Sequence, residues 1–201
     1  ILHADGTCFL LITNGFLMDA EKARRLSKYR FKWLQVSIDG ATAKYHDSFR
    51  RRDGSWKKAV NAALEVSKNG IPLTIAHTVT PDNLNEVDDM CSLAYSLGAG
   101  SIIIGEVNPS GRSAYSTELL LDDDMKNILY DKIENNRILF SGRMQIQRSS
   151  SVKNQLLRYK NTPNSGAIIR PNGDVRIDCM APFVIGNILE QDFFEVWKTK
   201  S

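Results

Sequence analysis

The sequence has no long apolar run and few cysteines. No apolar segment approaches the roughly 20 residues that a membrane-spanning helix needs, so we expect no membrane insertion. Its three cysteines are Cys8, Cys91 and Cys179, widely separated and odd in number. This excludes a disulfide framework and favours a reducing compartment, so we predict a cytoplasmic protein. The net charge of +3 gives no strong attraction to nucleic acid or to an anionic membrane, and we expect neither as a partner.

The 201 residues are 42% hydrophobic and 24% charged, which is ordinary for a folded protein. A chain of this length buries one core and forms one domain, or one domain with an appendage. It starts at Ile1 rather than at methionine and ends just after an expected helix. We therefore interpret it as a piece of a longer protein.

Short apolar runs alternate with amphipathic stretches along the first three quarters of the chain. Strands are expected at 8–13, 33–38, 73–79 and 101–107, and helices at 19–25, 55–68, 83–97 and 122–133. Ser55 is the expected cap of the second of these helices. Continuous apolar strands that alternate with helices are typical of a parallel sheet covered by helices. The sequence predicts an α/β fold.

The pattern changes near residue 148. Residues 145–151 are polar, and Ser149-Ser150-Ser151 is interpreted as a connector. The turn Pro171-Asn172-Gly173-Asp174 then joins two short strands, 167–170 and 175–178, because Asn-Gly favours the positive φ angles of a hairpin turn. A final helix is expected around 193–197. We predict an α/β domain over 1–147 and a small α+β extension over 148–201.

Polar residues follow each expected strand of the first domain, in the four segments 13–15, 37–50, 78–83 and 106–112. In a parallel sheet these segments lie at one edge, where ligands bind in barrel folds. Their hydroxyl, amide and guanidinium groups suit a ligand with a carboxylate and a ribose or phosphate.

Each polar group also has a purely structural interpretation. Asn-Gly and Asp-Gly after a strand are mainly turn residues. We expect His46 to be exposed or to cap a helix, and Arg50–Arg52 is typical of a solvated surface. Glu106 is a candidate general base, although a surface carboxylate is commoner. No residue is assigned as a catalytic acid or base.

Two of the three cysteines are expected to serve as packed core residues. Cys91 lies on the apolar face of an expected helix, and Cys8 begins an expected buried strand, so both are predicted to be core residues. Cys179 ends a hairpin strand and is the only thiol placed like a metal ligand. One cysteine alone does not hold a metal ion.

Five segments in order resemble radical S-adenosylmethionine (radical SAM) enzymes, in the branch with a C-terminal SPASM or twitch extension. They are LITNG, LQVSIDGATAKYHDSFRR, the stretch from GSWKKAV to PDNLNEV, SLGAGSIIIGEVNPSGRS, and GAIIRPNGDVRIDC followed by IGNILEQDFFEVW. The resemblance covers nearly the whole chain.

The resemblance implies a partial (β/α)6 barrel of parallel strands with a small hairpin-containing extension. It implies S-adenosylmethionine and a [4Fe–4S] cluster as cofactors. One electron from the cluster cleaves the sulfonium to give a 5′-deoxyadenosyl radical, which removes hydrogen from the substrate. By analogy with the branch, the substrate is a peptide or protein side chain, and the electron donor is a protein such as a flavodoxin or ferredoxin.

The resemblance also assigns cofactor-binding residues. Ser37 matches the serine that contacts the carboxylate of S-adenosylmethionine, and Arg50 matches the arginine that pairs with it. Thr13 and Asn14 match the Thr-Asn-Gly beside the cofactor. Arg112, in Gly-Arg, matches a residue near the adenosine end.

Two departures from the family pattern concern the clusters. The CxxxCxxC motif and the Gly-Gly-Glu segment of the first two strands do not occur in these 201 residues. The chain as it stands is therefore predicted to be inactive, with the cluster ligands outside it. Cys179 matches the second cysteine of the extension, an auxiliary-cluster ligand, but Asn164 and Ser165 stand where the first is usual.

Two alternatives remain open. A degenerate member of the family would bind a peptide or nucleotide without catalysis. An ordinary barrel enzyme would use the same edge of the sheet for a phosphate, with anion binding near Arg50–Arg52.

Overall fold

The computed structural model describes residues 8–109, 111–149, 167–176 and 183–198. The chain divides into two compact units, residues 1–149 and 150–201, each described here by itself. Within the described ranges, no helix is both long and apolar enough to cross a bilayer.

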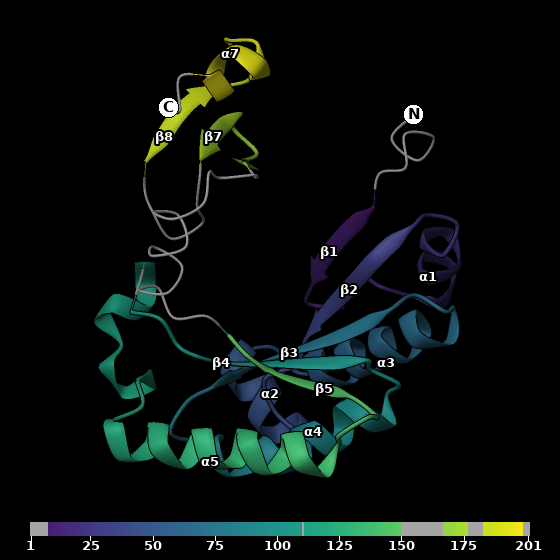
Figure 1. Ribbon diagram of the computed structural model, residues 1–201, viewed down its shortest axis with the longest axis vertical. Helices are drawn as coiled ribbons and strands as arrows, with labels where there is room; N and C mark the ends of the chain where they lie inside the picture. The colour runs from purple at the N-terminus through teal and green to yellow at the C-terminus, as the bar shows by residue number, and fades with distance from the viewer. Residues whose placement is uncertain (1–7, 110, 150–166, 177–182, 199–201) are drawn as a thin grey trace. The chain divides into compact units, whose positions relative to one another are not determined.

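The first unit is built on one five-stranded parallel sheet (Figure 1). Each strand pairs with the next along the chain, in the order β1 (Phe9–Thr13), β2 (Phe31–Ser37), β3 (Leu73–Val79), β4 (Ser101–Glu106) and β5 (Gln145–Arg148). The predicted α/β fold and the partial parallel barrel are confirmed. Strand β5 was not predicted, because it buries only Ile146 and its sequence is otherwise polar.

The helices of this unit are α1 (Ala20–Leu26), α2 (Ala43–Arg50), α3 (Ser55–Lys68), α4 (Val87–Ser96) and α5 (Asp123–Leu139). Short 3₁₀ turns, Leu84–Glu86, Gly111–Tyr115 and Thr117–Leu119, complete the connections. Helices α3, α4 and α5 pack on one face of the sheet (Figure 1).

Two local expectations need correction. Helix α2 was not predicted, because it buries only His46 and begins at Thr42 without a side-chain cap. Ser55 is the first residue of α3 rather than its cap. The cap position belongs to Gly54, which has a φ of 75° that few other residues adopt readily.

The hydrophobic core lies between the sheet and these helices. Alternate strand residues point into it and are fully buried, among them Leu34, Val36, Ile75, Ile102 and Ile104. Burying each such side chain contributes about 1.5–3 kcal/mol.

The two cysteines described in this unit differ from each other. Cys91 belongs to the core, as predicted, whereas the prediction for Cys8 was wrong because it is exposed just before β1. Burial raises the pKa of the Cys91 thiol to about 12.

The opposite face of the sheet mixes apolar side chains, such as Leu10, Ile12 and Trp33, with polar ones. The residues that alternate with the core positions include Gln35, Ser37, Thr78 and Gln147. This face therefore offers hydroxyl and amide groups, and its strands end at the edge that carries the predicted site.

The second unit contains a three-stranded antiparallel sheet, with β6 (Ile168–Ile169), β7 (Asp174–Arg176) and β8 (Val184–Asn187), followed by α7 (Phe193–Lys198). The predicted hairpin and helix are confirmed, and Gly173 has the positive φ, 85°, that its turn requires. Strand β8 was not predicted. Cys179, Asn164 and Ser165 lie outside the described residues.

Candidate functional site

The carboxyl ends of β1 to β4 lie along one edge of the sheet, because the strands are parallel neighbours. This edge, which we call the rim, carries the four polar segments that follow the strands. Thr13 and Ser37 are the last residues of β1 and β2, and Glu106 is the last of β4.

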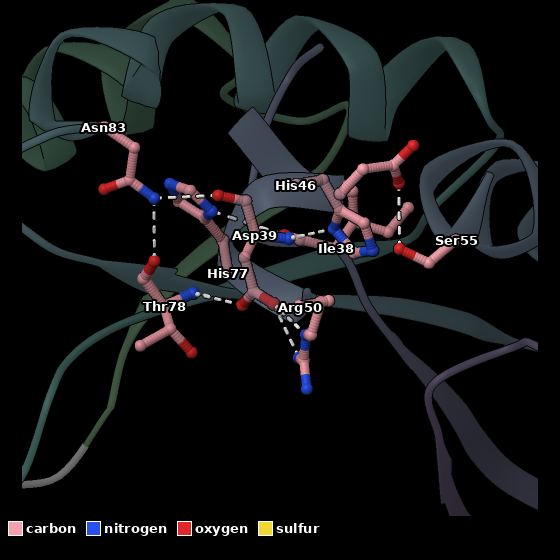
Figure 2. Close-up of polar contacts among 9 residues, drawn as sticks. Ile38, Asp39, His46, Arg50, Ser55, His77, Thr78 and Asn83 are labelled. Carbon is pink, nitrogen blue, oxygen red and sulfur yellow. Dashed lines mark hydrogen bonds and ion pairs between the residues drawn. The ribbon is translucent and has the colours of Figure 1, made fainter. Parts of the chain in front are cut away.

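Asp39 is the centre of a polar network at the end of β2 (Figure 2). Its side chain is 1% exposed, and its Oδ2 accepts from Nε of Arg50 at 2.6 Å and pairs with Nη2 at 2.5 Å. Its Oδ1 accepts from the backbone N–H of Thr78 at 3.3 Å. Its own carbonyl accepts from the Asn83 amide at 2.8 Å, and its backbone N–H donates to Nδ1 of His46 at 3.0 Å.

Sequence reasoning treated Asp39 as half of an Asp-Gly turn and missed this role. A buried carboxylate needs a charged partner. For Asp39 this partner is Arg50, which follows eleven positions later in α2. Sequence rules for turns consider only neighbouring residues, so they do not predict the contact between Asp39 and Arg50.

Asn83 and Tyr45 extend the network toward β3. The Asn83 amide also donates to the carbonyl of Thr78, and its Oδ1 accepts from the backbone N–H of Thr80. The Tyr45 and Thr80 hydroxyls lie 2.6 Å apart, and burial raises the pKa of Tyr45. The loop after β3 is thus fixed to the loop after β2.

His46 is buried, at 2% exposure, so the expectation of an exposed or capping histidine was wrong. Because a backbone N–H always donates, the bond from Asp39 makes Nδ1 of His46 an acceptor. The neutral ring therefore carries its proton on Nε2. Burial lowers the pKa of His46, which keeps the ring neutral at pH 7.

Asp47 ties α2 to α3. Its carboxylate accepts from the backbone N–H groups of Gly54 and Trp56 and from the Ser55 hydroxyl, at 2.7–2.8 Å. Burial alone would raise the pKa of Asp47, but these hydrogen bonds outweigh it and hold the pKa below its usual value. The turn that carries Arg50 is thereby held against the start of α3.

A cavity of about 270 Å³ lies at this end of the rim, lined by Asn14, Phe16, His46, Arg50, Arg52 and Ser55. The side-chain oxygen of Asn14 accepts from the backbone N–H of Phe16, which leaves the Asn14 amide nitrogen as a donor. The guanidinium of Arg52 stacks 3.7 Å from the centre of the Phe16 ring. Ser55 supplies the one hydroxyl.

Arg50 has a guanidinium with two usable edges. Asp39 occupies the edge formed by Nε and Nη2, and no other ion pair holds Arg50 among the described residues. The end formed by Nη1 and Nη2 remains for a second carboxylate. With Asn14, His46 and Arg52, it makes a cavity dominated by donors, which suits an anionic oxygen ligand.

A larger hollow, of about 540 Å³, lies beside α1. It is lined by Met18, Leu26 and Tyr29 and by the cationic side chains Lys22, Arg25 and Lys28. None of the predicted site residues contributes to it, and it lacks the buried polar network that orders the smaller cavity.

The remaining predicted residues are placed differently. The Thr13 hydroxyl accepts from the backbone N–H of Gly15, a turn contact. Ser37 is half-buried on the face of the sheet opposite the helices. Arg112 lies in the 3₁₀ turn Gly111–Tyr115, and its side chain is outside the described part of the structure. The structure thus brings Asn14 and Arg50 together in one cavity.

Glu106 belongs to the side of the sheet that faces the helices. Its Oε1 accepts from the hydroxyl of Tyr130 in α5 at 2.8 Å, and the guanidinium of Arg148 lies 3.8 Å from the centre of the same ring. These contacts give the carboxylate a structural partner, so the geometry does not favour Glu106 as a general base.

His77, on β3, is fully enclosed beneath the network. Its Nδ1 lies 3.3 Å from the carbonyl of Ile38, and its Nε2 has no hydrogen-bond partner. Burial lowers the pKa of His77 to about 4.

The described residues do not suit an iron–sulfur cluster. Within the described ranges, no group of three or more histidine, cysteine or acidic residues is placed so that it could hold a metal ion. A cluster of this kind needs several thiolates close together. Buried Cys91 and exposed Cys8 do not provide them.

Comparison with known proteins agrees with this geometry. Residues 2–94 match the family model described as the radical SAM superfamily. This stretch contains Asn14, Asp39, His46 and Arg50. The matched stretch, residues 2–94, is thus a radical SAM segment. The mycofactocin maturase MftC of Mycobacterium ulcerans is 32% identical over 92% of this chain and 53% of its own length.

Another relative is the AdoMet-dependent heme synthase of Methanosarcina barkeri, 28% identical over 96% of this chain and 61% of its own length. The chain thus spans between half and two thirds of the length of these two relatives. The crystal structure of Streptococcus suis SuiB covers 98% of the chain, and the chain covers 50% of SuiB, with a TM-score of 0.74.

SuiB has also been solved with S-adenosylmethionine and with its precursor peptide SuiA, with TM-scores of 0.69 and 0.68. Sequence identity to SuiB is only 11–13% in the three structures. The likeness to SuiB therefore shows that the chain shares its fold.

Proposed function

We propose that the protein is a radical SAM enzyme and that the 270 Å³ cavity at the rim binds the carboxylate of S-adenosylmethionine. The single observation that carries the proposal is the arrangement of Arg50. The buried carboxylate of Asp39 holds one edge of its guanidinium, and the other edge is left for a ligand. The radical SAM segment names S-adenosylmethionine as the ligand that such an anion site would take.

The donor set supports this ligand. Arg50 suits bidentate pairing with a carboxylate, and the Asn14 amide nitrogen adds a neutral donor at the end of β1. Ser37 is the proposed further contact, from the face of the sheet opposite the helices. Arg112 is proposed at the adenosine end, on the resemblance alone.

The cluster and its chemistry are proposed to come from outside the described residues. When bound, a [4Fe–4S] cluster supplies the electron for reductive cleavage of S-adenosylmethionine. The 201 residues contain no CxxxCxxC motif. We therefore propose that this stretch alone is inactive, which iron analysis of the isolated stretch after reconstitution would test.

The proposed substrate is a peptide or protein, and SuiB, solved with a precursor peptide, supports that class through the shared fold. Residues 148–201 are proposed to be a SPASM- or twitch-like extension, in keeping with the small sheet and helix seen there. The proposed electron donor is a flavodoxin or ferredoxin, and the proposed compartment is the cytoplasm.

The test is to replace Arg50 by lysine in the full-length protein with its cluster reconstituted. Lysine keeps the charge, but its single ammonium group is occupied by Asp39 and has no second edge for a ligand. We expect the affinity for S-adenosylmethionine, measured by anaerobic titration calorimetry, to fall about tenfold or more.

Arg51→Lys is the matched control, because Arg51 is the next residue and does not line the cavity. It should bind as the wild type does. Equal losses in the two variants, or no loss in Arg50→Lys, would contradict the proposed site. Binding of inorganic phosphate that depends on Arg50, without binding of S-adenosylmethionine, would favour the phosphate alternative.

A further inference from the structure

His46 has one ring nitrogen committed to the fold and one that is not. Its Nδ1 accepts from the backbone N–H of Asp39. Its Nε2 makes no hydrogen bond to any described residue, and the ring lines the cavity that also contains Arg50. Among the described residues, the side-chain atoms that are buried without a partner are Nε2 of His77 and Nε of Arg176, so Nε2 of His46 is accessible from the cavity. A donor that the protein leaves free in a cavity is available to a ligand.

Burial, rather than the charges around it, keeps His46 neutral. Asp39, Asp47 and Arg50 all act on the ring, and burial is the largest influence on its pKa, which is lowered. Protonation of Nδ1 would also bring two N–H donors into repulsive contact, because the backbone N–H of Asp39 already points at Nδ1. The ring is thus fixed in one tautomer, with its N–H on Nε2.

We propose that His46 is a ligand-binding residue that donates its Nε2–H to the carboxylate held by Arg50. This inference rests on the proposed binding of S-adenosylmethionine at the same cavity. A neutral donor suits the place, because Arg50 and Arg52 already line the cavity with two positive charges. A third cation would repel them, whereas an imidazole N–H adds a directed hydrogen bond without charge.

The competing explanation is that His46 serves only to accept the backbone N–H of Asp39. Two substitutions separate the two roles. In asparagine, Oδ1 lies the same number of bonds from Cα as Nδ1 of histidine. Thus His46→Asn keeps an acceptor for Asp39 and removes the donor in the cavity.

His46→Gln does the reverse. Its amide nitrogen lies as many bonds from Cα as Nε2 of histidine, so the variant keeps a donor toward the cavity. It places no acceptor where Nδ1 was. The buried N–H of Asp39 then loses its partner.

The experiment measures both binding and stability in the full-length protein with its cluster reconstituted. Titration calorimetry uses S-adenosylmethionine and 5′-methylthioadenosine, which lacks the carboxylate. Urea unfolding of each variant is followed by circular dichroism. The two ligands together show whether an effect depends on the carboxylate.

We expect His46→Asn to weaken S-adenosylmethionine binding about tenfold, the size of one hydrogen bond to a charged group, and to leave 5′-methylthioadenosine binding unchanged. His46→Gln should bind S-adenosylmethionine within about threefold of wild type and unfold at lower urea concentration. The opposite pattern overturns the proposal, as does an equal loss for both ligands. If the wild type fails to bind S-adenosylmethionine, the proposed function fails with it, whereas a failure confined to the His46 variants removes only this inference.

Discussion

The two ends of the rim hold their carboxylates in contrasting ways. At the end of β2, Asp39 is almost completely buried and is bonded through its side chain and through both of its backbone polar groups. At the end of β4, Glu106 is half-buried and accepts one hydrogen bond from Tyr130. The first arrangement fixes an arginine toward a cavity, and the second fastens a helix to the sheet.

The difference shows what buried polar contacts do at this rim. A buried carboxylate with several partners permits one geometry only, because any movement leaves a charge or an N–H unpaired. Such rigidity is what a binding site needs to recognise a planar anion. A single, partly solvated hydrogen bond gives no comparable restraint, since water replaces it when it breaks.

The largest effect is expected from Asp39→Ala. It leaves the Arg50 guanidinium and the Thr78 N–H without their partner, and we expect unfolding free energy to fall by about 2–4 kcal/mol. Urea denaturation measures this, with Glu106→Ala as the matched change at the other end, expected to cost about 1 kcal/mol. Equal losses in the two variants would remove the distinction between the two ends.

A smaller loss of unfolding free energy is expected when the pH is lowered, because the unfolded state binds a proton at His77 more tightly than the folded state does. Its pKa is about 4 in the folded protein and near 6.5 when unfolded, so the unfolded state takes up the proton first as the pH falls. The contribution to stability is complete above pH 6.5 and decreases toward pH 4, by roughly 3 kcal/mol.

Stability measured by urea unfolding at several pH values between 7 and 4 tests this, with His77→Leu as the comparison. Leucine cannot titrate, so its profile should be flatter over that window. The substitution removes the contact with the Ile38 carbonyl and also the unpartnered Nε2, so its own effect at pH 7 should be small. Parallel profiles in the two proteins would show that other groups cause the acid loss.

The smallest effect is expected from Tyr130→Phe. The change removes the hydrogen bond to Glu106 and leaves the ring under Arg148 in place. We expect a loss of about 0.5–1.5 kcal/mol in unfolding free energy and no change in ligand affinity, measured by urea denaturation and calorimetry. A clear loss of S-adenosylmethionine binding would show that the β4 end of the rim belongs to the binding site after all.

The parts of the fold that depend on local pattern were predictable. Apolar runs located β1 to β4, and the Asn-Gly turn located the hairpin. Both signals depend only on residues that are adjacent in the sequence. Strand β5 and helix α2 were missed, because each buries one side chain and is defined by contacts with distant segments.

The candidate site was likewise predictable only in part. Motif order singled out Asn14 and Arg50, which the structure places in one cavity. It did not reveal Asp39 or the orientation of His46, since both depend on contacts between the loop after β2 and helix α2. The residues assigned to the ligand by resemblance stay predictions until binding is measured.

The contacts of Asp47 have a consequence for how this sequence can vary. Its carboxylate bridges the end of α2 and the start of α3, so the link through Arg51, Arg52 and Asp53 is closed at both sides. An insertion in this link would separate Asp47 from its partners at the start of α3. The turn at Asn69 and Gly70, on the far side of α3, carries no such bridge. Among related sequences we therefore expect the first link to keep its length and the second to tolerate insertions.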